Sequence, residues 1–129
     1  MRCSKQKINH RPTWAEISLS AVEYNINQVK KLVSRQAKVL AVVKADAYGH
    51  GAVRVAQRLQ GCGIRHFGVA TVLEAVQLSQ HKIKGSILVF STAMPSELPD
   101  IIKHNLTLTI SDMNTAISFH KRLKKLNRK

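Results

Sequence analysis

The chain has 129 residues, enough for one domain with one hydrophobic core, and 44% of them are hydrophobic, as in ordinary globular proteins. Lysine and arginine total 21 against 7 aspartate and glutamate residues, which gives a formal net charge of +14. No apolar run approaches the roughly 18 residues of a membrane span, and no apolar stretch of a secretory signal follows the basic residues 1–11. We therefore expect a cytoplasmic protein with no membrane partner, and a basic flexible tail over residues 1–11.

The positive charge is concentrated at the two ends of the chain. Residues 120–129 carry six basic side chains and no acidic one, and the segment before Pro12 carries four more. Such an excess occurs in nucleic-acid-binding proteins, but basic ends and solvated helix faces are the commoner cause. Aromatic residues make up only 5% of the chain, which argues against a surface for stacking single strands. We expect no nucleic-acid partner and keep a basic nucleic-acid-binding module as an alternative.

The two cysteines, Cys3 and Cys62, indicate neither a disulfide framework nor a zinc site. No second pair of Cys or His residues stands at ligand spacing. We expect free thiols and no bound metal.

The first predicted elements are a strand over 13–19 and a helix over about 21–35. In TWAEISL apolar and polar residues alternate, which is typical of a half-buried strand. Ser20 and Glu23 then have the spacing of a capping box, in which Ser20 is the N-cap. Apolar residues recur at helical spacing after it.

From residue 38 onward, apolar strands alternate with helices. The strands are predicted at 38–43, 66–70, 86–90 and 106–110, and the helices at about 52–60, 72–80, 96–104 and 112–126. The helix starts carry capping signals, namely the Thr71–Glu74 capping box, Ser96 before Glu97, Asp112, and Pro99 in a first turn.

Short, continuously apolar strands between helices predict an α/β fold with a parallel sheet covered by helices. An open doubly wound sheet and a barrel both fit this pattern. The G-x-G-x-x-G fingerprint of the dinucleotide-binding sheet is absent. In a barrel, the four βα units at 38–126 would form about half of the eight that a closed (β/α)8 barrel needs.

Lys44 stands at the end of the first of these apolar strands, in the stretch VLAVVKADAYGHG. The carboxyl ends of strands in βα units open onto the face where loops build sites. A lysine amine in its neutral form is a nucleophile toward aldehydes, whereas an arginine guanidinium stays protonated. Tyr48 follows with a hydroxyl that can bond a phosphate, close to a predicted helix start near Gly51. This combination suits pyridoxal phosphate, although a lone lysine at a strand end is more often a solvated charge.

The stretch AVVKADAYGHG resembles the pyridoxal-phosphate attachment motif of the alanine racemases. RPTWAEISLSAVEYNI is similar to the start of the racemase chain, and HFGVATVLEAVQL and ILVFS are similar to later segments. The resemblance implies that residues 12–129 are part of a racemase N-terminal domain. In that case they form about the first half of a TIM-type (β/α)8 barrel, preceded by an N-terminal strand and helix.

The resemblance also implies the roles of single residues. Lys44 would carry the pyridoxal phosphate and act as one of two acid/base groups that move the α-proton of alanine. Tyr48 would hold the cofactor phosphate, and Val42 and Phe90 would help line the cofactor pocket. Asp46 and His50 belong to the motif, and for both we expect a structural role in orienting the loop.

Several parts that the resemblance implies have no match in this chain. They are a tyrosine base from the partner subunit of a homodimer, an arginine facing the pyridine nitrogen, the remaining barrel strands and a C-terminal β domain. We therefore expect an alanine racemase that supplies D-alanine for peptidoglycan, represented here by a truncated chain that is inactive alone. A racemase acting on another amino acid and a non-catalytic fragment remain as alternatives.

Overall fold

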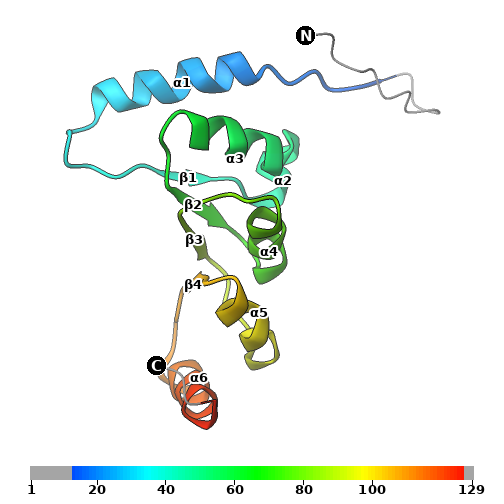
Figure 1. Ribbon diagram of the computed structural model, residues 1–129, viewed down its shortest axis with the longest axis vertical. Helices are drawn as coiled ribbons and strands as arrows, with labels where there is room; N and C mark the ends of the chain where they lie inside the picture. Colours follow the sequence, from blue (N-terminus) through cyan, green and yellow to red (C-terminus); the bar gives the residue numbers. More distant parts are fainter. Residues whose placement is uncertain (1–12, 127–129) are drawn as a thin grey trace.

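Four parallel strands form a single sheet in the computed structural model, which describes residues 13–126. They are β1 (Leu40–Val42), β2 (His66–Val69), β3 (Ser86–Val89) and β4 (Thr107–Leu108). The strands lie side by side in chain order, and each pairs in parallel with the next (Figure 1). The order never reverses, so the sheet has no topological switch point. Over residues 13–126 this order disagrees with the doubly wound alternative and confirms the sequential βα units of a barrel-type fold.

The helices between the strands cover one face of the sheet (Figure 1). They are α3 (Ala52–Gly61), α4 (Val72–Gln80) and α5 (Leu98–Lys103), and α5 follows directly on a 3-10 turn, η1 (Pro95–Glu97). At the ends of the chain, α1 (Leu19–Leu32) packs on α3, and α6 (Met113–Lys125) lies beyond β4. Within residues 13–126, no helix combines the length and the apolar character that crossing a membrane would need.

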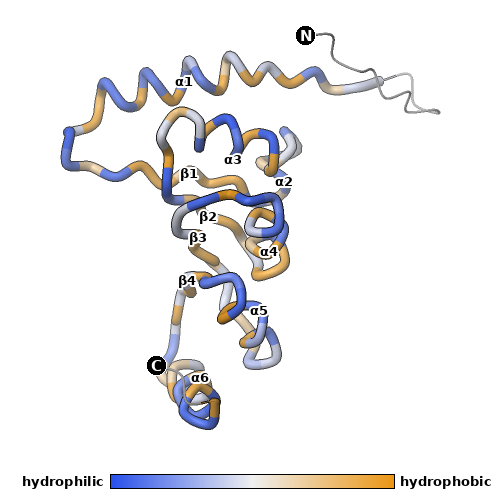
Figure 2. The backbone as a smooth tube through the Cα atoms, viewed as in Figure 1, coloured by the Kyte–Doolittle hydropathy of each residue, from blue (hydrophilic) through white to orange (hydrophobic). Residues whose placement is uncertain are grey.

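The hydrophobic core lies between the sheet and these helices. The trace is strongly hydrophobic along β1 and β3, as Figure 2 shows. The strand side chains on this face are almost fully buried, with exposed fractions of 3% or less for Val43, Phe67, Val69, Ile87 and Val89. The helices contribute the other side of the core, chiefly Val55, Leu59, Ala75, Leu78, Leu98 and Ile101.

The opposite face of the sheet is open. Because side chains alternate along a strand, the apolar residues on this face include Leu40 and Val42 of β1, Leu88 of β3 and the following Phe90. Leu40, Val42 and Phe90 are 39%, 37% and 37% exposed. This is the face that would point into the interior of a closed barrel.

Three successive helices end in the same way. Gly63, Lys82 and Asn105 have positive φ angles of 86°, 61° and 50° after α3, α4 and α5. The next residue in each case donates its backbone N–H back into the helix: Ile64 to Leu59 O at 3.0 Å, Ile83 to Leu78 O at 3.2 Å and Leu106 to Ile101 O at 3.0 Å. These are Schellman-type caps that return the chain to the sheet.

The predicted strand over 13–19 is wrong. Residues 13–18 form no strand, and α1 begins at Leu19 with Ser18, not Ser20, as its N-cap: the Ser18 hydroxyl accepts the Ala21 N–H at 3.2 Å. A strand needs a neighbour for its backbone N–H and C=O groups, and no segment within residues 13–126 pairs with this one. The expected basic tail at 1–11 lies outside the described residues.

The other predicted elements are present with shifted ends. The helix predicted at 96–104 is η1 followed by α5, with Pro99 in the first turn of α5, and the cap is not Ser96. Instead, the Glu97 carboxylate accepts the backbone N–H of Met94 at 2.7 Å. The Thr71–Glu74 capping box and the Asp112 cap are confirmed.

Candidate active site

Lys44 follows the end of β1 after one intervening residue, at the edge where the carboxyl ends of the strands meet. Val43, just before it, is 2% exposed and donates its backbone N–H to Gly68 O at 2.8 Å, which extends the pairing with β2. The Lys44 side chain is exposed, and within residues 13–126 it forms neither an ion pair nor a hydrogen bond. Its amine is therefore available to a ligand at the carboxyl end of the sheet.

The residues after Lys44 form a left-handed helical turn, α2 (Lys44–Gly49). Ala45, Asp46, Ala47 and Tyr48 have φ between 51° and 56° and ψ between 39° and 50°. The Ala47 N–H bonds to Val43 O at 2.9 Å, as in one turn of helix. Left-handed helical backbone costs about 1–2 kcal/mol per residue for L-amino acids, so four such non-glycine residues in succession must be held by their surroundings.

Asp46 and His50 supply part of that support. Asp46 Oδ1 accepts the Ala52 N–H at the start of α3 at 2.7 Å. His50 Nδ1 lies 2.8 Å from Ala47 O and 3.1 Å from Tyr48 O. Both side chains therefore bond to the backbone of the turn or of the helix after it, as expected for residues that orient the loop.

Glu74 is a residue of this site that sequence reasoning missed. Its Oε1 accepts the Ala45 N–H at 2.8 Å, directly after Lys44. Its Oε2 accepts the N–H groups of Ala70 at 2.7 Å and Thr71 at 3.2 Å. The capping-box pattern signals the bond to Thr71, but the bond to Ala45 depends on β1 and β2 being neighbours, which the local pattern does not contain.

Val42 and Phe90 lie on the open face near the same edge. Val42 is in register with Gly68, and Gly68 with Leu88, two residues before Phe90. The Phe90 ring covers Gly68, where an added Cβ would lie 2.5 Å from Phe90 Cζ. The Tyr48 ring is 61% exposed, and its hydroxyl makes no hydrogen bond within residues 13–126.

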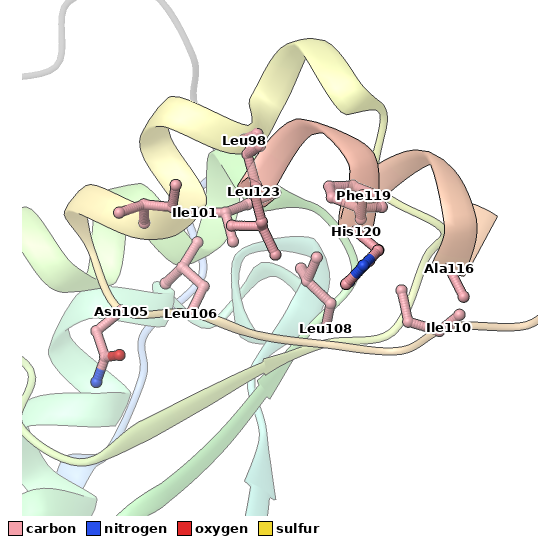
Figure 3. Close-up of a pocket in the computed structure, with 11 residues that line it drawn as sticks. Leu98, Ile101, Asn105, Leu106, Leu108, Ile110, Ala116, Phe119, His120 and Leu123 are labelled. Atoms are coloured by element: carbon pink, nitrogen blue, oxygen red, sulfur yellow. The ribbon is translucent and has the colours of Figure 1, made fainter. Parts of the chain in front are cut away.

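A cavity of about 600 Å³ lies elsewhere, between α5, β4 and α6 (Figure 3). Its lining is mostly apolar and includes Leu98, Ile101, Leu108, Phe119 and Leu123, with His120 at its edge. No residue of the Lys44 turn lines it. Over residues 13–126 there is also no group of three or more His, Cys, Asp or Glu side chains that could hold a metal ion.

Residues 17–129 match the family model described as alanine racemase, N-terminal domain. The chain belongs to this family. Its curated relatives include alanine racemase 1 of Caldanaerobacter subterraneus subsp. tengcongensis, 43% identical over 119 residues that cover 92% of this chain and 31% of the relative. An amino-acid racemase of Enterococcus faecalis is 42% identical over 85% of this chain and 16% of the relative.

Solved structures agree with this assignment. Alanine racemase of Clostridium difficile 630 superposes with a TM-score of 0.86 at 37% identity, over 95% of this chain and 33% of that one. The same enzyme in complex with cycloserine gives a TM-score of 0.86 over 92% of this chain. The chain thus spans about a third of the length of these racemases.

The described residues of this racemase-family chain fit the aldehyde end of pyridoxal phosphate. The Lys44 amine is a free primary amine, and Val42 and Phe90 provide an apolar wall on the same sheet edge. The Tyr48 hydroxyl is a free donor for an anion four residues further along the turn.

Proposed function

We propose that this chain carries the cofactor-attachment site of a pyridoxal-phosphate-dependent racemase that interconverts L-alanine and D-alanine. The observation that carries the proposal is the free amine of Lys44, held at the carboxyl end of β1 by a left-handed turn, in a chain of the alanine racemase N-terminal domain family.

Each residue of the site has a role in this proposal. Lys44 Nζ attaches the cofactor and exchanges a proton with the α-carbon of alanine on one face. The Tyr48 hydroxyl donates to the cofactor phosphate, and Val42 and Phe90 exclude water from one side of the pocket. When bound, pyridoxal phosphate withdraws electrons from the α-carbon, which makes its proton acidic enough for a side-chain base to remove.

The rest of the proposal concerns the whole protein. The resemblance calls for a tyrosine base from a partner subunit and an arginine facing the pyridine nitrogen, and neither has a match among these 129 residues. A homodimer, a cytoplasmic location and a supply of D-alanine to peptidoglycan complete the proposed function.

A racemase of another amino acid is the second candidate. The 42% identity to the amino-acid racemase of Enterococcus faecalis, almost as high as the 43% to alanine racemase 1, favours keeping it. Both candidates need the same attachment site.

The test of the attachment site is covalent trapping. The chain is mixed with less than one equivalent of pyridoxal phosphate, its absorbance spectrum is recorded, and borohydride reduction is followed by peptide mass spectrometry. We expect the label on Lys44, and we expect Lys44→Ala to lose it. Lys84→Ala is the matched control, since Lys84 is an exposed lysine remote from the turn in sequence, and it should leave the label in place. A label spread evenly over the many lysines would contradict the proposal.

A further inference from the structure

We propose that Glu74 is a positioning residue that fixes the turn bearing Lys44 and thereby the place of its amine. This inference deepens the proposed function and rests on it. The Glu74 carboxylate connects the backbone after β1 to the backbone after β2: Oε1 accepts from Ala45 at 2.8 Å, and Oε2 accepts from Ala70 at 2.7 Å.

The Lys44 turn needs a bond of this kind at its start. The first N–H groups of any helical turn lack partners inside the turn. Here the internal bonds begin with Ala47 N–H to Val43 O, so the N–H of Ala45 has no partner within the turn. Glu74 Oε1 accepts a hydrogen bond from that N–H, while Oε2 caps the start of α4. A single carboxylate thus caps two helical segments of opposite hand.

Only a carboxylate of this length can make both sets of bonds. A glutamine has one accepting oxygen and one donating NH₂ group, so it would turn a donor toward either Ala45 or Ala70. An aspartate is one methylene shorter, so it keeps the charge but is too short to accept from both Ala45 and Ala70.

Glu97 provides a matched control within the chain. Its carboxylate also accepts the backbone N–H three residues before it, Met94, at 2.7 Å at a helix start. It makes no bond to the Lys44 turn. Glu97→Gln therefore removes the same charge at a helix start, while its amide oxygen can still accept from Met94, and it leaves the Lys44 turn untouched.

In the Glu74→Gln variant, the change in charge and the loss of positioning should shift the strength of cofactor attachment in opposite directions. Pyridoxal phosphate is an anion, so removing the negative charge of Glu74 would by electrostatics strengthen its attachment. Loss of positioning weakens the attachment instead. The sign of the change therefore separates the two explanations.

The experiment measures amide hydrogen exchange and cofactor trapping on the 129-residue chain, for the wild type, Glu74→Gln, Glu74→Asp and Glu97→Gln. Losing one net hydrogen bond should make Ala45 exchange about threefold to tenfold faster in both Glu74 variants. The pyridoxal phosphate concentration that half-saturates borohydride trapping at Lys44 should rise by a similar factor. Glu97→Gln should change neither. Glu74→Asp retains the charge and serves as the variant to measure if Glu74→Gln does not fold.

The inference is overturned if Ala45 exchange is unchanged in the Glu74 variants. It is also overturned if Lys44 trapping changes equally in Glu74→Gln and Glu97→Gln, or becomes tighter in Glu74→Gln. A wild-type chain that shows no trapping at Lys44 would instead reject the proposed function.

Discussion

Gly68 in β2 and Gly85 just before β3 show how differently two glycines can be constrained. The three atoms nearest a Cβ on Gly68 would all belong to the ring of Phe90, with Cζ at 2.5 Å and Cε2 at 2.9 Å. A Cβ on Gly85 would meet the backbone oxygen of Arg65 at 2.1 Å, and its φ of 122° is one that side-chain-bearing residues rarely adopt. The Phe90 ring borders the open face and can swing outward, whereas the backbone of Arg65 cannot yield.

We therefore expect Gly85→Ala to lower the free energy of unfolding by about 2–4 kcal/mol, because of backbone strain and overpacking. Gly68→Ala should change it by less than about 1 kcal/mol, because only the ring moves. Urea unfolding measures both, and the Phe90 ring resonances should shift in Gly68→Ala. Gly61→Ala is the control, since Gly61 is helical with nothing within 4 Å, and it should stabilise the chain by about 0.5–1 kcal/mol. Equal losses at Gly68 and Gly85 would contradict this account.

Lys82 occupies a position that favours glycine. It has a φ of 61° in the cap after α4, where the equivalent residue after α3 is Gly63. Relief of the left-handed strain exceeds the added chain entropy of glycine, so Lys82→Gly should stabilise the chain by about 0.5–1 kcal/mol. Gly63→Ala should cost about 1 kcal/mol by the same reasoning. Thermal and urea unfolding would measure both changes, and a loss of stability in Lys82→Gly would show that its side chain matters more than its backbone.

At the scale of elements, the sequence predicts the regular parts of the fold and misses the irregular one. The βα alternation and most helix starts follow from apolar periodicity and capping residues such as Thr71 and Asp112, which act locally. The left-handed turn over Ala45–Tyr48 contains no glycine, so no local preference indicates it. Contacts with Glu74 and Ala52, which exist only in the folded chain, hold it in place.

The strand predicted over residues 13–19 is absent for a related reason. The alternation of these residues is that of a strand, but alternation states only which side chains would share a face. Whether a strand forms depends on a partner for its backbone, and the described residues offer none. The structure therefore starts α1 at Leu19, one residue after the serine that caps it.

The N-terminus of α6 should respond to acid. The Thr115 hydroxyl and N–H donate to the Asp112 carboxylate at 2.6 Å and 2.8 Å, and these bonds hold the pKa of Asp112 below its ordinary value of 3.8. A depressed pKa means that the cap contributes fully above the unfolded value and is lost as the pH falls through the folded one.

We therefore expect the first turn of α6 to fray as the pH falls below about 3.8, as measured by hydrogen exchange or by the Thr115 amide resonance. Asp112→Asn keeps a capping oxygen without the titration, so its α6 should show no such transition. Fraying of both proteins at the same pH would assign the effect to other carboxyl groups.

At the scale of the whole molecule, the sheet is half of a barrel with one face left open. β1 pairs only with β2, and β4 only with β3, among the described residues. Apolar side chains on the open face, including Leu40 and Val42, remain about two-fifths exposed. The βα periodicity alone leaves the choice between a barrel and a doubly wound sheet open; the resemblance to the alanine racemases predicts the half-barrel, and the strand order β1-β2-β3-β4 agrees with it.

The acid/base side chains present in these 129 residues limit what the chain can catalyse. Racemisation takes a proton from one face of the α-carbon and returns one to the other, so it needs an acid/base group on each side. In the proposed function, Lys44 serves one side. The chain has two tyrosines, of which Tyr48 belongs to the Lys44 turn and Tyr24 lies on α1, with an exposed fraction of 65%. Neither matches the base that the family resemblance calls for.

We therefore expect the 129-residue chain, supplied with pyridoxal phosphate and L-alanine, to form D-alanine no faster than its Lys44→Ala variant under the same conditions. Chiral chromatography of the reaction mixture measures the product directly, and the variant accounts for the reaction of free cofactor. Trapping at Lys44 without D-alanine formation would separate attachment from turnover, as half a barrel with one base requires. D-alanine produced at the rate of a full-length alanine racemase would show that these residues supply both bases.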